Sequence, residues 1–241
     1  MSDSSGPLSA ARLAEQMGDA LPGPESLPPS ADELVARTRE LVEAVVLTDV
    51  ADDLRAEAAR TLARVADTLR VEQREAPLWL VRHPDGRLES LLQAGSGRLN
   101  PQAPPIEWIE RPAEPPAGAE PVPAQVRARC VFTAAHAGSP SRVHGGVLAA
   151  ALDEVLGNAV TASGVSGLTV SLTVSFKGAT PVDTSVELVG RYAGHEGRKS
   201  YATGEVLVGG AVVVEASAVY VAARREPPTD DRHAGHHEEE R

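Results

Sequence analysis

The sequence predicts an α+β domain in which an antiparallel sheet packs around one apolar helix. Three observations predict this class: residues 147–156 are apolar almost all round, residues 168–176 alternate strictly between apolar and hydroxyl side chains, and further strand-like stretches follow. A helix without a polar face must be enclosed by the rest of its domain. Strands with one apolar face can provide that cover.

The predicted helix begins at His144-Gly145-Gly146. Two glycines let the backbone come close to a ligand, and the first amides of a helix lack intrahelical partners and favour negative charge. An amide at Gly145 could therefore stabilise the oxyanion that forms when a carbonyl is attacked. The alternative is an ordinary turn, with His144 as a common helix-entry residue.

Asp153 is a carboxylate within this apolar stretch, eight residues beyond Gly145. At a rise of about 1.5 Å per residue, the two residues are about 12 Å apart along the helix axis. A general base must come within about 3 Å of its water, so these residues of one chain cannot serve one reaction. We therefore predict a symmetric dimer with antiparallel helices and two composite sites. The alternative is that Asp153 is a structural carboxylate.

The strand at residues 168–176 is predicted to have one apolar face and one polar face. The polar face carries the hydroxyl side chains Thr169, Ser171, Thr173 and Ser175. Glycines at positions 209 and 210 predict a tight hairpin between the last two strands. The other predicted strands cover residues 126–134, 186–192, 199–208 and 211–222.

These residues resemble the PaaI-like acyl-CoA thioesterases of the hotdog fold, over roughly residues 99–224. The resemblance rests on the loop at 137–143, the His-Gly-Gly element with its helix, and the strand at 169–177. It implies a sheet wrapped around a central helix, and a cytoplasmic homodimer or dimer of dimers. The implied reaction hydrolyses an acyl-CoA to a free acid and coenzyme A, without a metal or redox cofactor.

The resemblance also implies roles for individual residues. The Gly145 amide polarises the thioester carbonyl, while Gly146 and His144 shape the pocket around it. Asp153 is the base or nucleophile, and Thr169 orients the attacking water across the dimer interface. Glu154 is rotated by about 100° around the helix axis and is the second candidate for the carboxylate.

Two loop positions depart from the family pattern. Many relatives carry Asn six residues before the His, where this chain has Gly138, and the usual Glu is replaced by Ala137. His136 could fill part of that region, although an exposed loop position is the favoured interpretation. Two other functions therefore stay open: a hotdog hydratase or dehydratase, whose His-Phe-Pro-Gly element is missing, and a non-catalytic acyl-CoA binding or assembly module.

Charge is distributed unevenly along the chain. The net charge is −11, which argues against nucleic-acid binding, yet residues 126–225 carry nine Lys and Arg against seven Asp and Glu. Coenzyme A has phosphates that cations of this domain could bind by charge-assisted hydrogen bonds. The candidates are Arg142, Lys177, Arg191, Arg198 and Lys199, with Arg198 and Lys199 favoured. The alternative for each is a solvated side chain.

The single cysteine, Cys130, excludes an intrachain disulfide and is predicted to be a core residue. No signal-peptide pattern and no apolar run of about 20 residues is seen, so neither secretion nor membrane insertion is expected. Cytoplasmic residence is the resulting prediction.

Five segments are predicted along the chain. Residues 30–77 form a helical extension that opens with a capping box at Ser30 to Glu33 and carries an apolar stripe including Leu54, Leu62 and Leu69. A structural brace is the favoured role for this extension, ahead of a lid or an oligomerisation element. The other segments are a disordered N-terminus at 1–29, a connector with a small hairpin at 78–98, the hotdog domain at 99–225, and a disordered tail at 226–241.

Overall fold

The computed structural model describes residues 21–75, 78–116, 119–165 and 167–222. The predicted tail at 226–241 and most of the predicted N-terminal segment lie outside these residues. Residues 24–26 form a short 3-10 helix, η2 (Pro24–Ser26), and Leu21 packs against Leu80 in a small apolar cluster.

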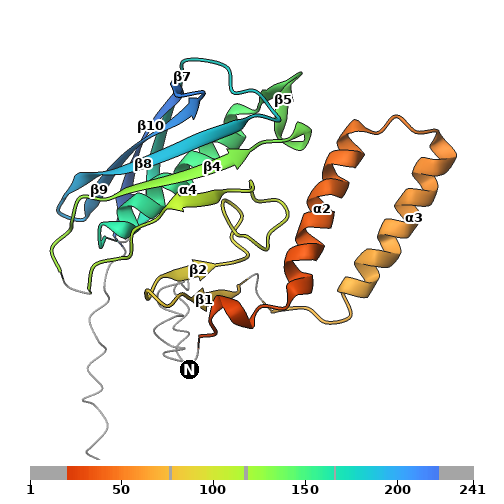
Figure 1. Cartoon of the computed structure of the whole chain (residues 1–241), viewed down its shortest axis with the longest axis horizontal. Helices are drawn as coiled ribbons and strands as arrows, with labels where there is room; N and C mark the ends of the chain where they lie inside the picture. The colour runs from red at the N-terminus through yellow and green to blue at the C-terminus, as the bar shows by residue number, and fades with distance from the viewer. Residues whose placement is uncertain (1–20, 76–77, 117–118, 166, 223–241) are drawn as a thin grey trace, which may run out of the picture.

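The main domain is built on a six-stranded antiparallel sheet with the order β3-β4-β8-β9-β10-β7. The α+β class predicted from the sequence is confirmed by this sheet and the helices beside it (Figure 1). Gly209 and Gly210 form the β9–β10 turn with φ of +57° and +85°, values that glycine adopts without strain. The strands are β3 (Glu107–Glu110), β4 (Gln125–Val131), β7 (Leu168–Phe176), β8 (Ser185–Glu196), β9 (Lys199–Val208) and β10 (Ala211–Val221).

Helix α4 (Gly145–Ala162) lies against one face of this sheet and contacts β4, β7, β8, β9 and β10 (Figure 1). Its buried side chains include Leu148, Leu152 and Leu156, which join the main hydrophobic core. Gly190 and Gly204 are cross-strand partners directly under the helix. A Cβ atom at Gly190 would lie 2.6 Å from the Val155 carbonyl oxygen, so the missing side chain allows the helix to pack closely.

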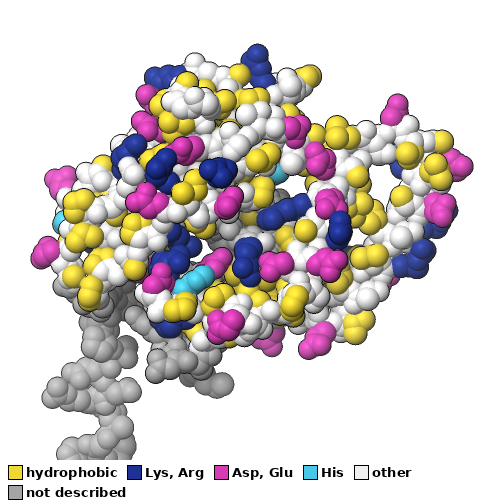
Figure 2. Space-filling model, viewed as in Figure 1, with side chains coloured by type: hydrophobic (Ala, Val, Ile, Leu, Met, Phe, Trp, Pro, Cys, Tyr) yellow, Lys and Arg dark blue, Asp and Glu magenta, His cyan; other side chains and the backbone are white. Residues whose placement is uncertain are grey.

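Two helices precede the sheet and form a hairpin at one side of the main domain (Figure 1). Helix α2 (Pro29–Leu47) buries only Val35, and α3 (Asp52–Leu69) has no buried residue. Hydrophobic side chains are therefore exposed on both helices (Figure 2). The predicted capping box does not form: α2 begins at Pro29, where a missing N–H costs nothing, and has no side-chain cap.

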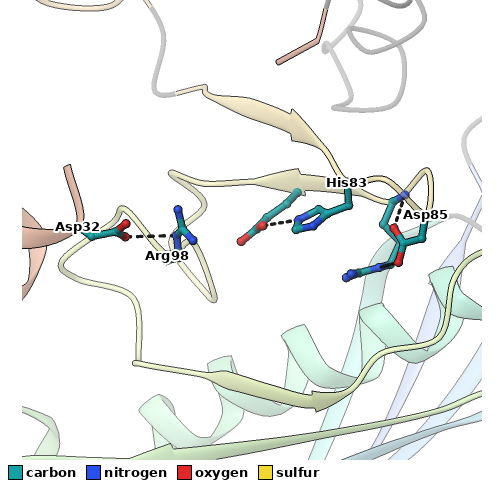
Figure 3. Close-up of polar contacts among 6 residues, drawn as sticks. Asp32, His83, Asp85 and Arg98 are labelled. Carbon is teal, nitrogen blue, oxygen red and sulfur yellow. Dashed lines mark hydrogen bonds and ion pairs between the residues drawn. The ribbon is translucent and has the colours of Figure 1, made fainter. Parts of the chain in front are cut away.

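Residues 78–105, called the connector from here on, include β1 (Leu80–Arg82) and β2 (Leu88–Ser90) and join the helices to the main domain. Arg98 Nε lies 3.3 Å from Asp32 Oδ1 and links the connector to the start of α2, while His83 pairs with Glu89 at 2.7 Å (Figure 3). Arg39 of α2 donates through Nη2 to the backbone oxygens of Asn100 and Ala103, at 3.1 and 3.2 Å. These bonds attach α2 to the connector.

Cys130 is buried on β4, and burial raises the pKa of its thiol to about 12. The thiol therefore stays protonated at neutral pH, as expected of a core residue. Among the described residues, no helix combines the length and apolar character needed to cross a bilayer.

Candidate active site

The two glycine amides at the start of α4 differ in their hydrogen bonding. The Gly146 amide donates to Nδ1 of His144, which is the N-cap residue, over 3.0 Å. Within the described residues, the Gly145 amide has no hydrogen-bond acceptor. The start of the helix therefore offers the Gly145 amide to a ligand, because the Gly146 amide is already bonded to the His144 ring.

Phe176, the last residue of β7, lies over this helix start. A Cβ atom at Gly145 would come 2.9 Å from the ring atom Cζ of Phe176, so no larger residue fits at position 145 without movement of the ring. The Phe176 side chain is 55% exposed. The free amide and an exposed aromatic ring thus lie side by side at one end of α4.

Strand β7 contains an irregularity that changes the face on which Thr169 lies. Val219 pairs with Ser171, whereas the next residue, Tyr220, pairs with Thr169, so Val170 is left without a partner as in a β-bulge. Directly paired residues share a face, and Tyr220 is buried toward α4. The prediction that Thr169 shares the outer polar face with Ser171 is therefore wrong, because the bulge turns Thr169 toward α4.

Asp153 lies in a polar niche made by this bulge. Thr169 Oγ1 donates to Asp153 Oδ1 over 3.0 Å, and the Tyr220 hydroxyl donates to the Asp153 backbone oxygen over 3.2 Å. Burial raises the pKa of Tyr220, which therefore remains a proton donor at neutral pH. Tyr220 was not predicted as a site residue, because its position in a mostly apolar strand gives no sign of a neighbouring carboxylate.

Glu154, the second candidate carboxylate, faces a different part of the molecule. It accepts hydrogen bonds from Gln93 Nε2 and, at 2.9 Å, from Ser96 Oγ, both in the connector. Burial raises the pKa of Glu154. The carboxylate of Glu154 is thus used in fixing the connector to α4, whereas the carboxylate of Asp153 faces the edge strand.

Gly145 is the first residue of α4, whereas Asp153 lies near the middle of the same helix. Helix α4 runs unbroken from Gly145 to Ala162, and β7 returns beside it so that Phe176 is near Gly145 and Thr169 is near Asp153. The structure of one chain therefore does not bring the amide and the carboxylate together.

The loop before α4 explains one departure from the family pattern. Gly138 packs so closely on His144 that a Cβ atom would lie 2.8 Å from the His144 Cα, so Asn does not fit this conformation. His136 is half-buried rather than exposed, because its Nδ1 accepts from the Thr133 amide at 3.1 Å and its ring packs edge-on against Phe132. Burial lowers the pKa of His136.

The predicted phosphate-binding cations fall into two groups. Arg142 and Lys177 lie close in sequence to Gly145 and Phe176, respectively, at the start of α4. Lys177 forms an ion pair with Glu215 at 3.2 Å.

Arg198 and Lys199 lie at the β8–β9 turn, away from that end of the molecule. Lys199 pairs with Val221, which in turn pairs with Leu168 at the beginning of β7. Arg198 Nη2 donates to the Ala222 backbone oxygen over 2.7 Å. Arg191, the remaining candidate, is paired with Glu205 at 2.9 Å.

A cavity of about 730 Å³ lies between α2 and the start of α4. The connector supplies one wall with Ala94 and the Pro-rich stretch at 101–105. Helix α2 supplies another with Thr38, Arg39, Glu40, Val42 and Glu43. The remaining walls come from Thr133, Ala135, His136, His144, Gly146, Val147 and Ala150. A volume of this size is typical of small-molecule sites.

Comparisons with known proteins agree with this fold. No family model and no curated protein matches the chain. A crystal structure of a thioesterase superfamily protein matches 83% of this chain and 93% of its own length, with 26% sequence identity and a TM-score of 0.67.

Two more distant structures cover about half of the chain. The E. coli PaaI protein from the phenylacetic acid degradation operon has 14% identity and a TM-score of 0.42, and covers 48% of this chain and 82% of its own. A hypothetical thioesterase protein with coenzyme A from Streptococcus pneumoniae has 16% identity and a TM-score of 0.43, and covers 50% of this chain and 91% of its own. The first match, which covers most of both chains, shows that this chain has the hotdog-type fold of a thioesterase superfamily protein.

Proposed function

We propose that the chain is an acyl-CoA thioesterase that works as a homodimer with two composite sites. Each site combines the Gly145 amide of one subunit with Asp153 of the other. The observation that carries the proposal is the hydrogen bond from Thr169 to Asp153, which holds a carboxylate at the open edge of the sheet. The unused amide at the start of the same helix supplies the complementary half.

The edge strand β7 supports the dimer. Its outer edge has no partner strand within the described residues, and Leu168, Val170 and Phe176 are each more than half exposed. A long edge with apolar side chains favours pairing with another chain. Antiparallel pairing of two β7 strands about a twofold axis brings the Thr169 end of one copy to the Phe176 end of the other. Asp153 then approaches the Gly145 amide of the second copy.

The carboxylate of Asp153 and the backbone amide of Gly145 determine the chemistry of the proposed site. Asp153 takes a proton from a water molecule, whose oxygen attacks the thioester carbonyl, while Thr169 fixes the position of the carboxylate. The Gly145 amide donates to the resulting oxyanion. When the intermediate collapses, the C–S bond breaks, and Asp153 returns the proton to the departing sulfur. Direct attack by the carboxylate, followed by hydrolysis of the anhydride, uses the same residues.

The same dimer explains the two groups of cations. Arg142 and Lys177 lie at the Gly145 end of their own subunit, and the twofold axis brings Arg198 and Lys199 of the second subunit toward that end. Side chains from both subunits can then bind the phosphates of one coenzyme A.

The test is free-thiol release by the purified protein from short-chain, long-chain and aryl acyl-CoAs, beside the variant Asp153→Asn. We expect a loss of about 100-fold or more in the variant, as for an essential base. Equal rates would show that Asp153 is not the catalytic carboxylate. A change in the acyl chain with an intact thioester would indicate a hydratase, and the absence of any reaction would indicate a binding module.

A further inference from the structure

Helix α2 contributes directly to the cavity beside the proposed active site. Thr38, Val42 and Glu43 of α2 line the cavity together with Gly146 and Ala150 of α4. Thr38 and Ala150 are 112 positions apart in the sequence and belong to different parts of the fold. The cavity therefore exists only because α2 lies opposite the start of α4.

The position of α2 is fixed by specific contacts. Arg39 donates to the backbone oxygens of Asn100 and Ala103, and Asp32 pairs with Arg98 (Figure 3). Arg39 and Ala103 themselves line the cavity. The wall made by α2 is thus attached to the wall made by the connector.

The lining next to the helix start is mainly apolar. Val42, Ala94, Pro104, Val147 and Ala150 all contribute carbon surface to it. A cavity of about 730 Å³ is far larger than an acetyl group needs, and its apolar walls favour a hydrocarbon chain. A thioester whose carbonyl meets the Gly145 amide can place its acyl chain there, because Gly146 borders the same cavity.

We infer that α2 forms the wall of the acyl-binding pocket, and that Val42 sets the length of acyl chain that the enzyme accepts. This inference rests on the proposed thioesterase function for its substrate. The N-terminal hairpin is then a specificity element in addition to a structural brace. The favoured substrates are acyl-CoAs with a hydrocarbon chain of medium or greater length.

The test compares two variants of α2. Val42 and Val45 are similarly exposed, at 44% and 55%, but of the two only Val42 lines the cavity. Val42→Phe therefore places a larger ring at the cavity wall, whereas Val45→Phe adds the same ring away from it. The measured quantity is the ratio of kcat/KM for decanoyl-CoA to that for acetyl-CoA. We expect this ratio to fall by about 10-fold or more in Val42→Phe, on the scale of pocket discrimination by size, and to match wild type in Val45→Phe. Equal ratios in all three proteins would overturn the inference.

Isothermal titration calorimetry with decanoic acid tests acyl binding in the cavity without depending on hydrolysis. If no acyl-CoA is hydrolysed, the proposed function is wrong, while weaker binding to Val42→Phe than to Val45→Phe would still support the pocket. Equal binding to both variants, or no binding to wild type, would contradict it.

Discussion

Thr169 Oγ1 lies 3.0 Å from Asp153 Oδ1, on the face of β7 opposite to the hydroxyls of Ser171, Thr173 and Ser175. One unpaired residue, Val170, produces this change of face. The bulge gives Asp153 a hydrogen-bond donor in a strand whose other inward-facing residues are apolar.

Replacing Thr169 by Val should lower kcat by about 10-fold, because the carboxylate loses the donor that fixes its position. Thr169→Ser keeps a hydroxyl and should retain most of the activity. Thr173→Val makes the same chemical change on the outer face of β7 and is the matched control. A Thr169→Val enzyme with wild-type kcat would show that the hydrogen bond has no part in catalysis.

Gly145→Ala should reduce activity by about 100-fold, because the new methyl group forces the Phe176 ring or the helix start to move and displaces the amide. Gly157→Ala is the control within the same helix, since a Cβ atom there has only ordinary contacts of 3.7 Å. Steady-state kinetics with one acyl-CoA compares the two. Similar activity in both variants would remove Gly145 from the proposed mechanism.

Val170→Lys should weaken the dimer, since it places a charge on the exposed edge of β7. Sedimentation velocity should show a shift toward the monomer, and activity should fall with it. Val71→Lys, on an 86% exposed residue after α3, is the control for added charge. A monomeric wild-type protein with full activity would exclude the composite site.

Glu154→Gln should alter the pH dependence of stability. Burial raises the folded-state pKa of Glu154, so its contribution to stability is present at low pH and is lost as the pH rises through that pKa. Gln can accept from Gln93 Nε2 with its oxygen and donate from its amide nitrogen to Ser96 Oγ, whose own proton can go to Gln93 Oε1, 3.0 Å away. The uncharged variant should therefore be more stable than wild type above this pKa and similar below the ordinary pKa of glutamate. Urea unfolding between about pH 4 and pH 8 measures the difference.

Glu154→Ala is the companion to that experiment. It removes both hydrogen bonds to position 154, although Ser96 Oγ keeps Gln93 Oε1 as an acceptor and the exposed Gln93 amide can bond to water. The variant should therefore cost about 1 kcal/mol of unfolding free energy. If Glu154→Gln showed the same pH dependence as wild type, the titration of this carboxylate would not be linked to folding.

Gly138→Asn, which restores the residue found in many relatives, should decrease both stability and activity here. Its Cβ atom would lie within 2.9 Å of three atoms of His144, the residue that caps α4. Thermal unfolding and thiol release measure the two effects. An increase in activity would mean that the loop can change conformation to accept the side chain.

The sequence is sufficient to predict helices and strands that show a clear pattern of apolar residues along the chain. The helix after His144 and the strands that follow were predicted because apolar periodicity depends on near neighbours in the chain. The face of Thr169 was predicted wrongly, because strict alternation in the sequence cannot show where a bulge interrupts the pairing.

The sequence pattern does not predict contacts between residues that lie far apart in the chain. Glu154 is bonded to Gln93, 61 residues earlier, and Tyr220 reaches Asp153 from the last strand. The cavity between α2 and α4 depends in the same way on tertiary packing, which periodicity does not encode. Its lining could therefore be identified only from the structure.

Because Gly145 and Asp153 are eight positions apart on one helix, the proposed composite dimer has a consequence for mixtures of two mutant chains. In a mixed dimer of an Asp153→Asn chain and a chain disabled at Gly145, one site contains both defects and the other contains neither. Two inactive proteins, mixed and allowed to exchange subunits, would therefore regain activity by intersubunit complementation.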